Sequence, residues 1–212
     1  MKYPLASISW DSKEYQAAMR VLSGDLYSMG ERTEEFESIY SEWAGVKYSV
    51  FCNSGSSANL LALAACLYDP RQDLNVGDEV LVPSVSWSTT YSPIQQLGLV
   101  PKLVDVSVDD FNISPALLEK SITSKSKAVF AVNLLGVSCK YDQITDICDR
   151  RGLILLEDNC ESMGATFGDR KTGNFGLIST HSTFFSHHMA TMEGGICCTN
   201  DELLSEILRS LR

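Results

Sequence analysis

Hydrophobic and polar residues follow two periodic patterns along this chain, and the first is the spacing of amphipathic helices. Apolar residues recur at helical spacing from residue 11 to 22 and from 31 to 43. Asp11 or Ser12 is the candidate N-cap of the first of these helices. Further helical patterns lie at 56–67, 89–97, 115–122 and 142–151. An apolar stripe at 203–211 runs up to Arg212.

The second pattern consists of short apolar runs between these helices, typical of buried strands. The runs lie at 48–52, 79–82, 102–106, 128–132, 153–156, 179–185 and 195–198. Strands that alternate with helices predict an α/β fold, with a mostly parallel mixed sheet between layers of helices.

Composition and charge narrow the class of protein. With 44% hydrophobic and 21% charged residues the chain reads as globular, and no apolar run approaches the roughly 20 residues of a membrane helix. A formal net charge of −10 argues against nucleic acid or an anionic membrane as the main partner, although local donors can still hold a diphosphate. The N-terminus lacks the apolar run of a signal peptide, so we expect a cytoplasmic protein.

The seven cysteines predict buried free thiols rather than a metal site. Their number is odd, and most lie inside apolar runs, as expected in a reducing compartment. Cys197 and Cys198 are adjacent on a predicted strand and should face opposite ways, and no Cys-x-x-Cys spacing occurs. We therefore expect no bound metal.

Three groups of polar residues directly follow predicted strands. Gly55 and Ser56 open a helix whose N-terminus could hold an anion, although a plain helix cap gives the same pattern. Trp87 follows the next strand and is either core or a ligand contact at the carboxyl edge of the sheet. Asp158 and Glu161 come after a third strand, where carboxylates serve function or capping rather than the core.

The segment 184–195, Phe-Phe-Ser-His-His-Met-Ala-Thr-Met-Glu-Gly-Gly, resembles the cofactor-lysine segment of the DegT/DnrJ/EryC1/StrS family of sugar aminotransferases. Counting back six residues from Glu193 places His187 where that family has its lysine. Histidine cannot hold pyridoxal phosphate covalently, but it can still accept and donate protons. His188 is the alternative base, and His181 is expected to be structural.

The resemblance implies a fold and a set of site residues. It implies an N-terminal segment at 1–30 and, at 31–212, the large domain of a fold-type-I pyridoxal phosphate enzyme, cut off before a smaller second domain. Gly55, Ser56 and Ser182 would bind the cofactor phosphate, and Trp87 would stack on its ring. Asp158 would pair with the ring nitrogen, and Glu161 would lie beside the cofactor or substrate. Family members form homodimers with shared active sites.

With histidine in place of the lysine, the chain resembles one subgroup of the family, the sugar 3-dehydratases. That likeness implies pyridoxal or pyridoxamine 5'-phosphate as cofactor, glutamate as amino donor and a nucleotide-linked 4-keto-6-deoxy sugar as substrate, in deoxysugar and O-antigen synthesis. The GDP-mannose type is favoured. The alternative, a CDP-sugar type, carries an iron–sulfur cluster. That type has a cysteine at the position of Cys160, so Cys160 could be mistaken for a cluster ligand. An ordinary aminotransferase would need lysine at position 187, and a non-catalytic paralogue is a further alternative.

Overall fold

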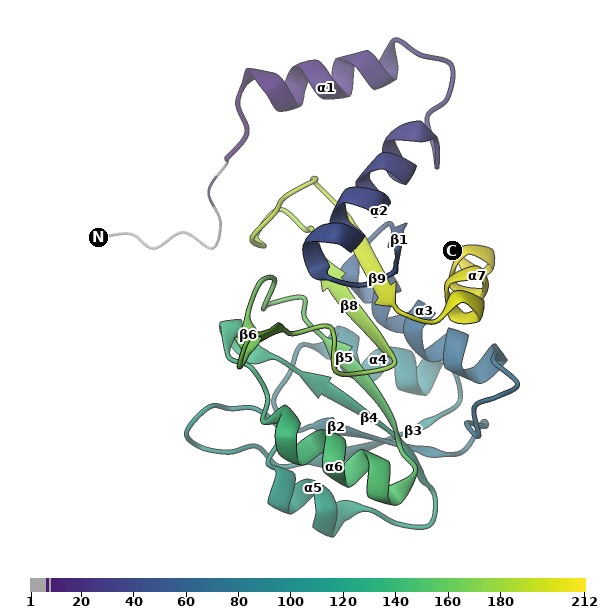
Figure 1. Ribbon diagram of the computed structural model, residues 1–212, viewed down its shortest axis with the longest axis vertical. Coiled ribbons are helices and arrows are strands. Elements are labelled where there is room, and N and C mark those ends of the chain that lie inside the picture. The colour runs from purple at the N-terminus through teal and green to yellow at the C-terminus, as the bar shows by residue number, and fades with distance from the viewer. Residues whose placement is uncertain (1–6, 8) are drawn as a thin grey trace.

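A seven-stranded sheet forms the centre of the computed structural model, which describes residue 7 and residues 9–212 (Figure 1). Its strand order is β1-β9-β8-β5-β4-β2-β3. The strands are β1 (Tyr48–Cys52), β2 (Glu79–Pro83), β3 (Val100–Val104), β4 (Ser126–Val132), β5 (Ile154–Asp158), β8 (Ile178–Ser182) and β9 (Gly195–Thr199). Neighbours from β8 to β3 pair in parallel, whereas β9 is antiparallel to both β1 and β8. The predicted mostly parallel mixed sheet is confirmed.

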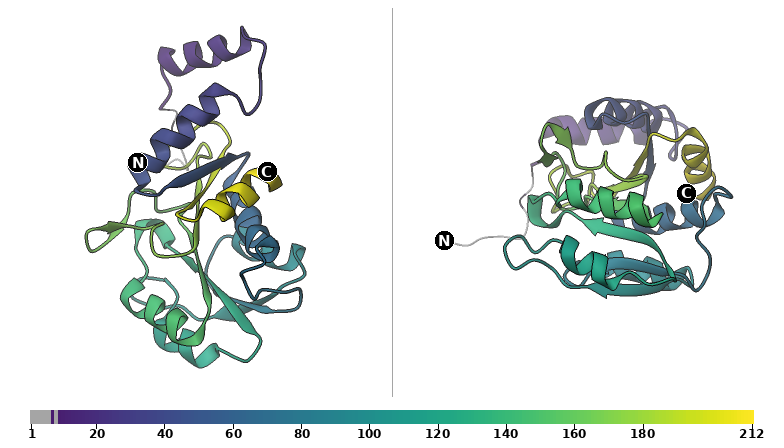
Figure 2. Two further views of the ribbon diagram at one scale, coloured as in Figure 1. Left: turned by 45° about the vertical axis from the view of Figure 1, so that its right-hand side comes forward. Right: turned by 60° about the horizontal axis from the view of Figure 1, so that its bottom comes forward.

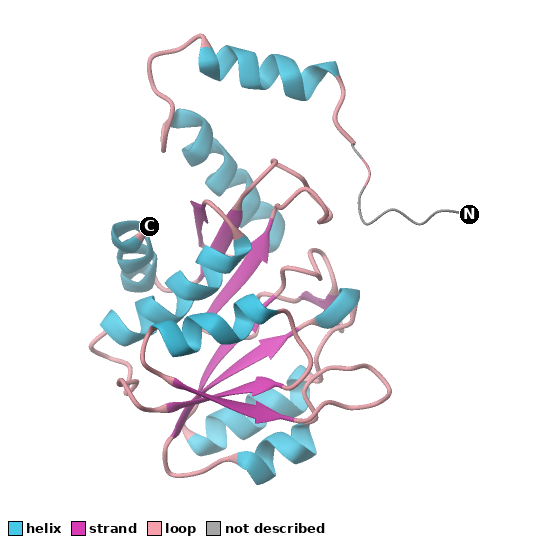
Figure 3. Cartoon of the chain, turned by 180° about the vertical axis from the view of Figure 1, so that it is seen from behind, coloured by secondary structure: helices cyan, strands magenta, loops and turns pink. Residues whose placement is uncertain are grey.

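Helices cover both faces of the sheet (Figure 3). One face carries α3 (Gly55–Tyr68), α4 (Ser88–Gln96) and α7 (Glu202–Leu211). The other face carries α2 (Glu31–Ala44), α5 (Pro115–Ser121) and α6 (Tyr141–Arg151). Each face of the sheet has its own hydrophobic core, and successive residues of a strand pack into the two cores alternately. Leu155, for example, packs on the α6 side and Leu156 on the α3 side. Cys197 and Cys198 likewise face opposite sides, as predicted.

The first helix, α1 (Ser12–Leu22), stands apart from this layered body (Figures 1 and 2). Asp11 caps it in a capping box with Glu14, so one of the two expected caps is confirmed. None of its residues is buried. Among the described residues, no helix has the length and hydrophobicity to cross a membrane.

Several strands have their carboxyl ends at the same edge of the sheet. Ser182 of β8 lies opposite Gly195, the first residue of β9, and Gly195 lies opposite Cys52 of β1. The carboxyl ends of β1, β2, β4, β5 and β8 therefore meet at this edge, where ligands of open α/β sheets bind.

The bounds of two predicted strands were wrong, and two short elements were missed. The strand predicted at 179–185 ends at Ser182, and the strand predicted at 102–106 lies at Val100–Val104, with Pro101 accommodated on the sheet edge. A short hairpin, β6 (Thr166–Phe167) with β7 (Arg170–Lys171), and a 3₁₀ turn, η1 (Leu134–Gly136), were not predicted.

Candidate active site

The N-terminus of α3 meets the end of β8 and forms the first part of the site. Ser54 caps the helix by accepting the N–H of Ser57 at 3.1 Å, which leaves the first-turn N–H groups of Gly55 and Ser56 without helical partners. A Cβ on Gly55 would lie 2.6 Å from the Cβ of Ser182 and 3.0 Å from its Oγ. The structure therefore brings the predicted phosphate residues together, with no room for a side chain at position 55.

Asp158, at the end of β5, lies buried next to this turn. Its Oδ2 accepts hydrogen bonds from Asn59 Nδ2 and Thr90 Oγ1, both at 2.9 Å, and its Oδ1 accepts the N–H of Cys160 at 3.1 Å. The Cys160 Sγ in turn lies 2.9 Å from where a Gly55 Cβ would be. Cys160 thus lies between the carboxylate and the turn at Gly55, and burial raises the pKa of its thiol, which stays protonated.

Glu161 braces a strained turn at the same edge. Its Oε2 accepts the N–H of Leu135 at 3.1 Å, and Leu135 adopts a left-handed conformation, with φ of 50°. Ser162 accepts the N–H of Gly136 at 2.9 Å from the other side. These contacts hold η1, the segment that follows β4, against the segment that follows β5.

His187 lies in a bend of the segment between β8 and β9. Its N–H bonds to the carbonyl of Phe184 at 2.9 Å, and its half-buried ring lies 6.2 Å from the Phe184 ring. Burial lowers the pKa of the His187 imidazole, with a further lowering from His188, while the carboxylates of Glu161 and Asp158 oppose the shift. A neutral imidazole at neutral pH is the state that a general base requires.

The bend that carries His187 is fixed at several points. Thr183 and Thr191 bond through their side chains at 2.6 Å, and the indole of Trp10 donates to the carbonyl of Ala190 at 3.0 Å. The glycines that follow are required by space, because a Cβ on Gly195 would lie 2.0 Å from the carbonyl oxygen of Ser54. The Glu-Gly-Gly motif therefore lets β9 start against the turn formed by Ser54 and Gly55.

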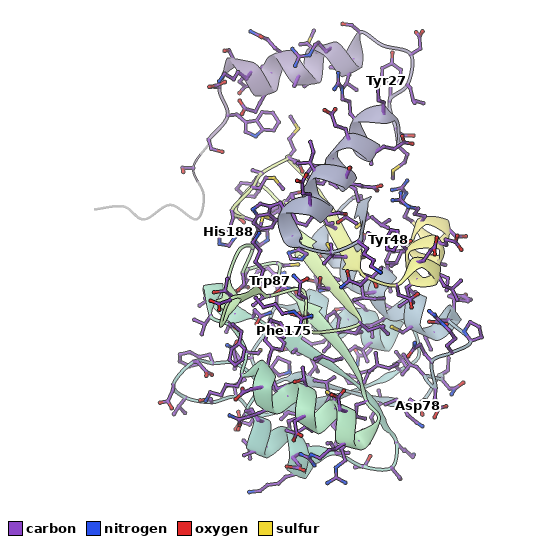
Figure 4. The ribbon with its side chains drawn as sticks, in the orientation of Figure 1. Tyr27, Tyr48, Asp78, Trp87, Phe175 and His188 are labelled. Carbon is purple, nitrogen blue, oxygen red and sulfur yellow. The ribbon has the colours of Figure 1, made fainter. Side chains whose placement is uncertain are left out.

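The other two histidines differ from His187 in their surroundings. His188 is exposed and labelled beside Trp87 on one side of the molecule in Figure 4. His181 is buried on the opposite face of the sheet from α3, where its ring packs edge-on to Tyr40 at 5.5 Å. Burial lowers the pKa of His181 to about 4, which fits the structural role expected for it.

Trp87 is the N-cap residue of α4 and leaves most of its ring open to solvent, with 70% exposed. This excludes the core alternative for Trp87. Two hollows of about 410 and 560 Å³ on the described chain contain none of the predicted site residues. At the carboxyl edge of the sheet, the exposed Trp87 thus stands beside site residues that are buried, Asp158 and Ser182.

Asn59 and Thr90, the side-chain partners of Asp158, received no role from the sequence patterns. Asn59 is 1% exposed and directly precedes the apolar run 60–67 of α3. A lone amide beside such a run was the available signal, because a buried amide needs hydrogen-bond partners. In the described part of the chain, no three His, Cys, Asp or Glu side chains are grouped to hold a metal.

These groups fit the cofactor implied by the resemblance. Free N–H groups and a serine hydroxyl suit a phosphate, and a buried carboxylate with spare acceptor capacity suits a protonated ring nitrogen. The exposed indole of Trp87 supplies a flat surface for a ring.

The chain matches the sequence profile of the DegT/DnrJ/EryC1/StrS aminotransferase family over residues 9–212. It is 48% identical to the GDP-4-keto-6-deoxy-D-mannose 3-dehydratase of Escherichia coli O55:H7, covering all of this chain and 55% of that enzyme. The chain thus spans about half the length of the curated relatives that it matches.

Solved structures of similar enzymes agree with the fold. GDP-4-keto-6-deoxymannose-3-dehydratase with a trapped PLP-glutamate geminal diamine is 48% identical, with a TM-score of 0.93 over 98% of this chain and 54% of the other. A second structure is of a variant of ColD, the short name of GDP-4-keto-6-deoxymannose-3-dehydratase. In this variant lysine replaces a histidine, and asparagine replaces the serine directly before it. It is 46% identical, with a TM-score of 0.91 over 95% of this chain and 53% of the other.

Proposed function

This chain belongs to the DegT/DnrJ/EryC1/StrS aminotransferase family, and from that premise we propose that it forms the cofactor-binding part of a sugar 3-dehydratase. The observation that carries the proposal is His187 at the position of the family's lysine. The last lysine of the chain, Lys171, is engaged elsewhere, with its ammonium 4.4 Å from the centre of the Trp43 ring. The chain therefore offers no lysine at position 187 for an ordinary aminotransferase reaction.

The residues that would hold pyridoxal phosphate lie on four elements. Gly55, Ser56 and Ser182 bind the phosphate, Trp87 stacks on the ring, and Asp158 meets the ring nitrogen. Glu161 contacts the cofactor or the substrate beside η1. When bound, the cofactor supplies an electron sink for carbon acid chemistry.

His187 performs the proton transfers in this proposal. Its neutral imidazole would accept a proton from the methylene carbon of the bound cofactor. The resulting imidazolium would give a proton to the departing C3 hydroxyl of the sugar, so that one side chain serves both steps. Two features support His187 over its neighbour. It is half-buried near Glu161 and Asp158, whereas His188 is exposed, and Ser186-His187 is the one Ser-His pair in the chain, matching the pair replaced in the ColD variant.

The proposed substrate is a GDP-linked 4-keto-6-deoxymannose, with glutamate as the amino donor, in deoxysugar and O-antigen synthesis. The names of the similar dehydratases and the glutamate adduct in one of them support both assignments. The reaction balances as follows. Glutamate and one water give 2-oxoglutarate, ammonia, two electrons and two protons. The electrons and protons reduce the sugar at C3, where the hydroxyl leaves as water and hydrogen takes its place.

A homodimer with a shared active site is part of the proposal. Trp87 is 70% exposed, so a second copy could cover its ring. α1 and the segment after it present exposed apolar side chains that a second copy could cover, including Met19, Leu22 and Tyr27. We propose residues 1–30 as an N-terminal segment, with α1 as the part that meets the partner, and 31–212 as the cofactor domain. A cytoplasmic location stays a prediction, and the CDP-sugar type with its iron–sulfur cluster stays the alternative.

Paired histidine variants test the proposal. In the intact protein with cofactor, glutamate and the GDP-linked 4-keto sugar, His187→Asn should lower the release of ammonia and 3-deoxy sugar by about 10²- to 10⁴-fold. His188→Asn, the matched control, should stay within a few-fold of the parent. The opposite ranking would assign the chemistry to His188, and no 3-deoxy sugar from the parent protein would refute the dehydratase itself.

A further inference from the structure

The amide of Asn59 joins four elements of the fold. It lies on α3, and its Nδ2 donates to the carbonyl of Thr89 on α4 at 3.2 Å and to Asp158 on β5 at 2.9 Å. Its Oδ1 accepts the hydroxyl of Thr180 on β8 at 2.6 Å. Both amide hydrogens are used, and the side chain is 1% exposed.

Each of these four elements carries one of the proposed cofactor contacts. α3 begins at Gly55, Trp87 caps α4, β5 ends at Asp158, and β8 ends at Ser182. One buried amide thus sets the spacing between the phosphate turn, the stacking ring and the carboxylate.

The bonding of Asp158 is unequal between its two oxygens. Oδ2 accepts from Asn59 and from Thr90, whose hydroxyl also lies 2.9 Å from Ser86 Oγ. Oδ1 accepts the N–H of Cys160, the one hydrogen bond to this oxygen among the described residues by distance, and the carboxylate adds to burial in raising the pKa of the nearby Cys160 thiol. Since a carboxylate oxygen takes about two hydrogen bonds, Oδ2 is saturated and Oδ1 keeps one free acceptor site.

We propose that Asn59 and Thr90 are positioning residues, which turn the Asp158 carboxylate so that Oδ1 faces the ring nitrogen of the cofactor. The inference rests on the proposed function in one respect, that Asp158 meets this nitrogen. Asn59 also keeps the Trp87 end of α4 in register with Asp158. Neither residue touches the reacting atoms.

Two nearly isosteric variants of the intact protein test this inference. Asn59→Leu removes the amide, and Thr90→Val removes one donor while keeping the shape. Because each variant loses a hydrogen bond to a charged group, the Kd for pyridoxal phosphate should rise about 10- to 100-fold. Thr90→Ser keeps the hydroxyl and should retain the parent Kd.

A second readout separates positioning from mere stability. With ¹⁵N-labelled cofactor, the ring nitrogen should give the signal of a protonated pyridine in the parent and in Thr90→Ser, and should shift towards the neutral form in the other two variants. Lower unfolding temperatures with unchanged Kd and ¹⁵N signal would overturn the inference and leave the proposed function intact. If Asn59→Leu does not fold, the Thr90 pair decides alone. A neutral ring nitrogen in the parent would overturn both the inference and the role of Asp158.

Discussion

Asp158→Asn separates the contribution of this carboxylate to the fold from its contribution to chemistry. The amide has one acceptor oxygen, which belongs at the Oδ2 position because Asn59 and Thr90 both donate there. Its NH₂ group then takes the Oδ1 position and faces the N–H of Cys160, so that one hydrogen bond of 3.1 Å is lost. One unsatisfied buried group costs about 1–3 kcal/mol of unfolding free energy. That is a fraction of the roughly 5–15 kcal/mol of a typical domain, and the fold should persist.

The effect on turnover should be much larger. At the ring nitrogen the variant presents a neutral N–H donor instead of a negative charge, and the loss of one preorganised electrostatic partner costs about 10²- to 10³-fold in rate. Denaturant unfolding measures the stability change, and ammonia release at saturating substrate measures the rate. Asp105→Asn, an exposed aspartate just after β3 at the same edge, is the control and should change neither. Turnover within a few-fold of the parent, with the fold intact, would refute the role given to Asp158.

Three further predictions concern the glycine motif, the base and the cofactor linkage. Gly195→Ala places a Cβ 2.0 Å from Ser54 O and should lower the unfolding free energy by about 1–3 kcal/mol or more in denaturant titrations, whereas Gly24→Ala, with no atom nearer than 3.4 Å, should be tolerated. The pKa of His187 is lowered from 6.5, so the acidic limb of kcat/KM should lie below pH 6.5, with activity lost as pH falls through it. Glu161→Gln removes a carboxylate that raises this pKa and should move the limb to still lower pH; a limb that moves up contradicts this. Borohydride treatment should leave the polypeptide mass unchanged, and a cofactor adduct on any lysine would be the opposing result.

The periodic patterns predicted the layered fold because a strand buried on both faces of the sheet is an unbroken run of apolar residues in the sequence. β4 and β5 read as unbroken apolar runs, since Leu155 and Leu156 serve different cores. The hairpin of β6 and β7 has strands of two residues each, too short to give any periodicity. The strand expected to reach residue 185 ends at Ser182, where the chain turns into the bend that carries His187.

The site was predicted in part. The local motifs placed Gly55 at the start of a helix and Asp158 at the end of a strand, as in the structure, because a turn after a strand is read from neighbouring residues. The contact of Asn59 with Asp158 spans 99 positions, and no local pattern encodes such a pair. The partners that orient the carboxylate therefore came only from the structure.

The sugar product of the intact protein is the most direct measure of the central claim, that histidine in place of lysine turns an aminotransferase fold to deoxygenation. The protein is supplied with cofactor, glutamate and GDP-linked 4-keto-6-deoxymannose, and the product is identified by mass spectrometry. The account predicts a 4-keto sugar that has lost the oxygen at C3, together with one ammonia for each sugar. A sugar that keeps its C3 hydroxyl and carries an amino group at C4 would contradict it.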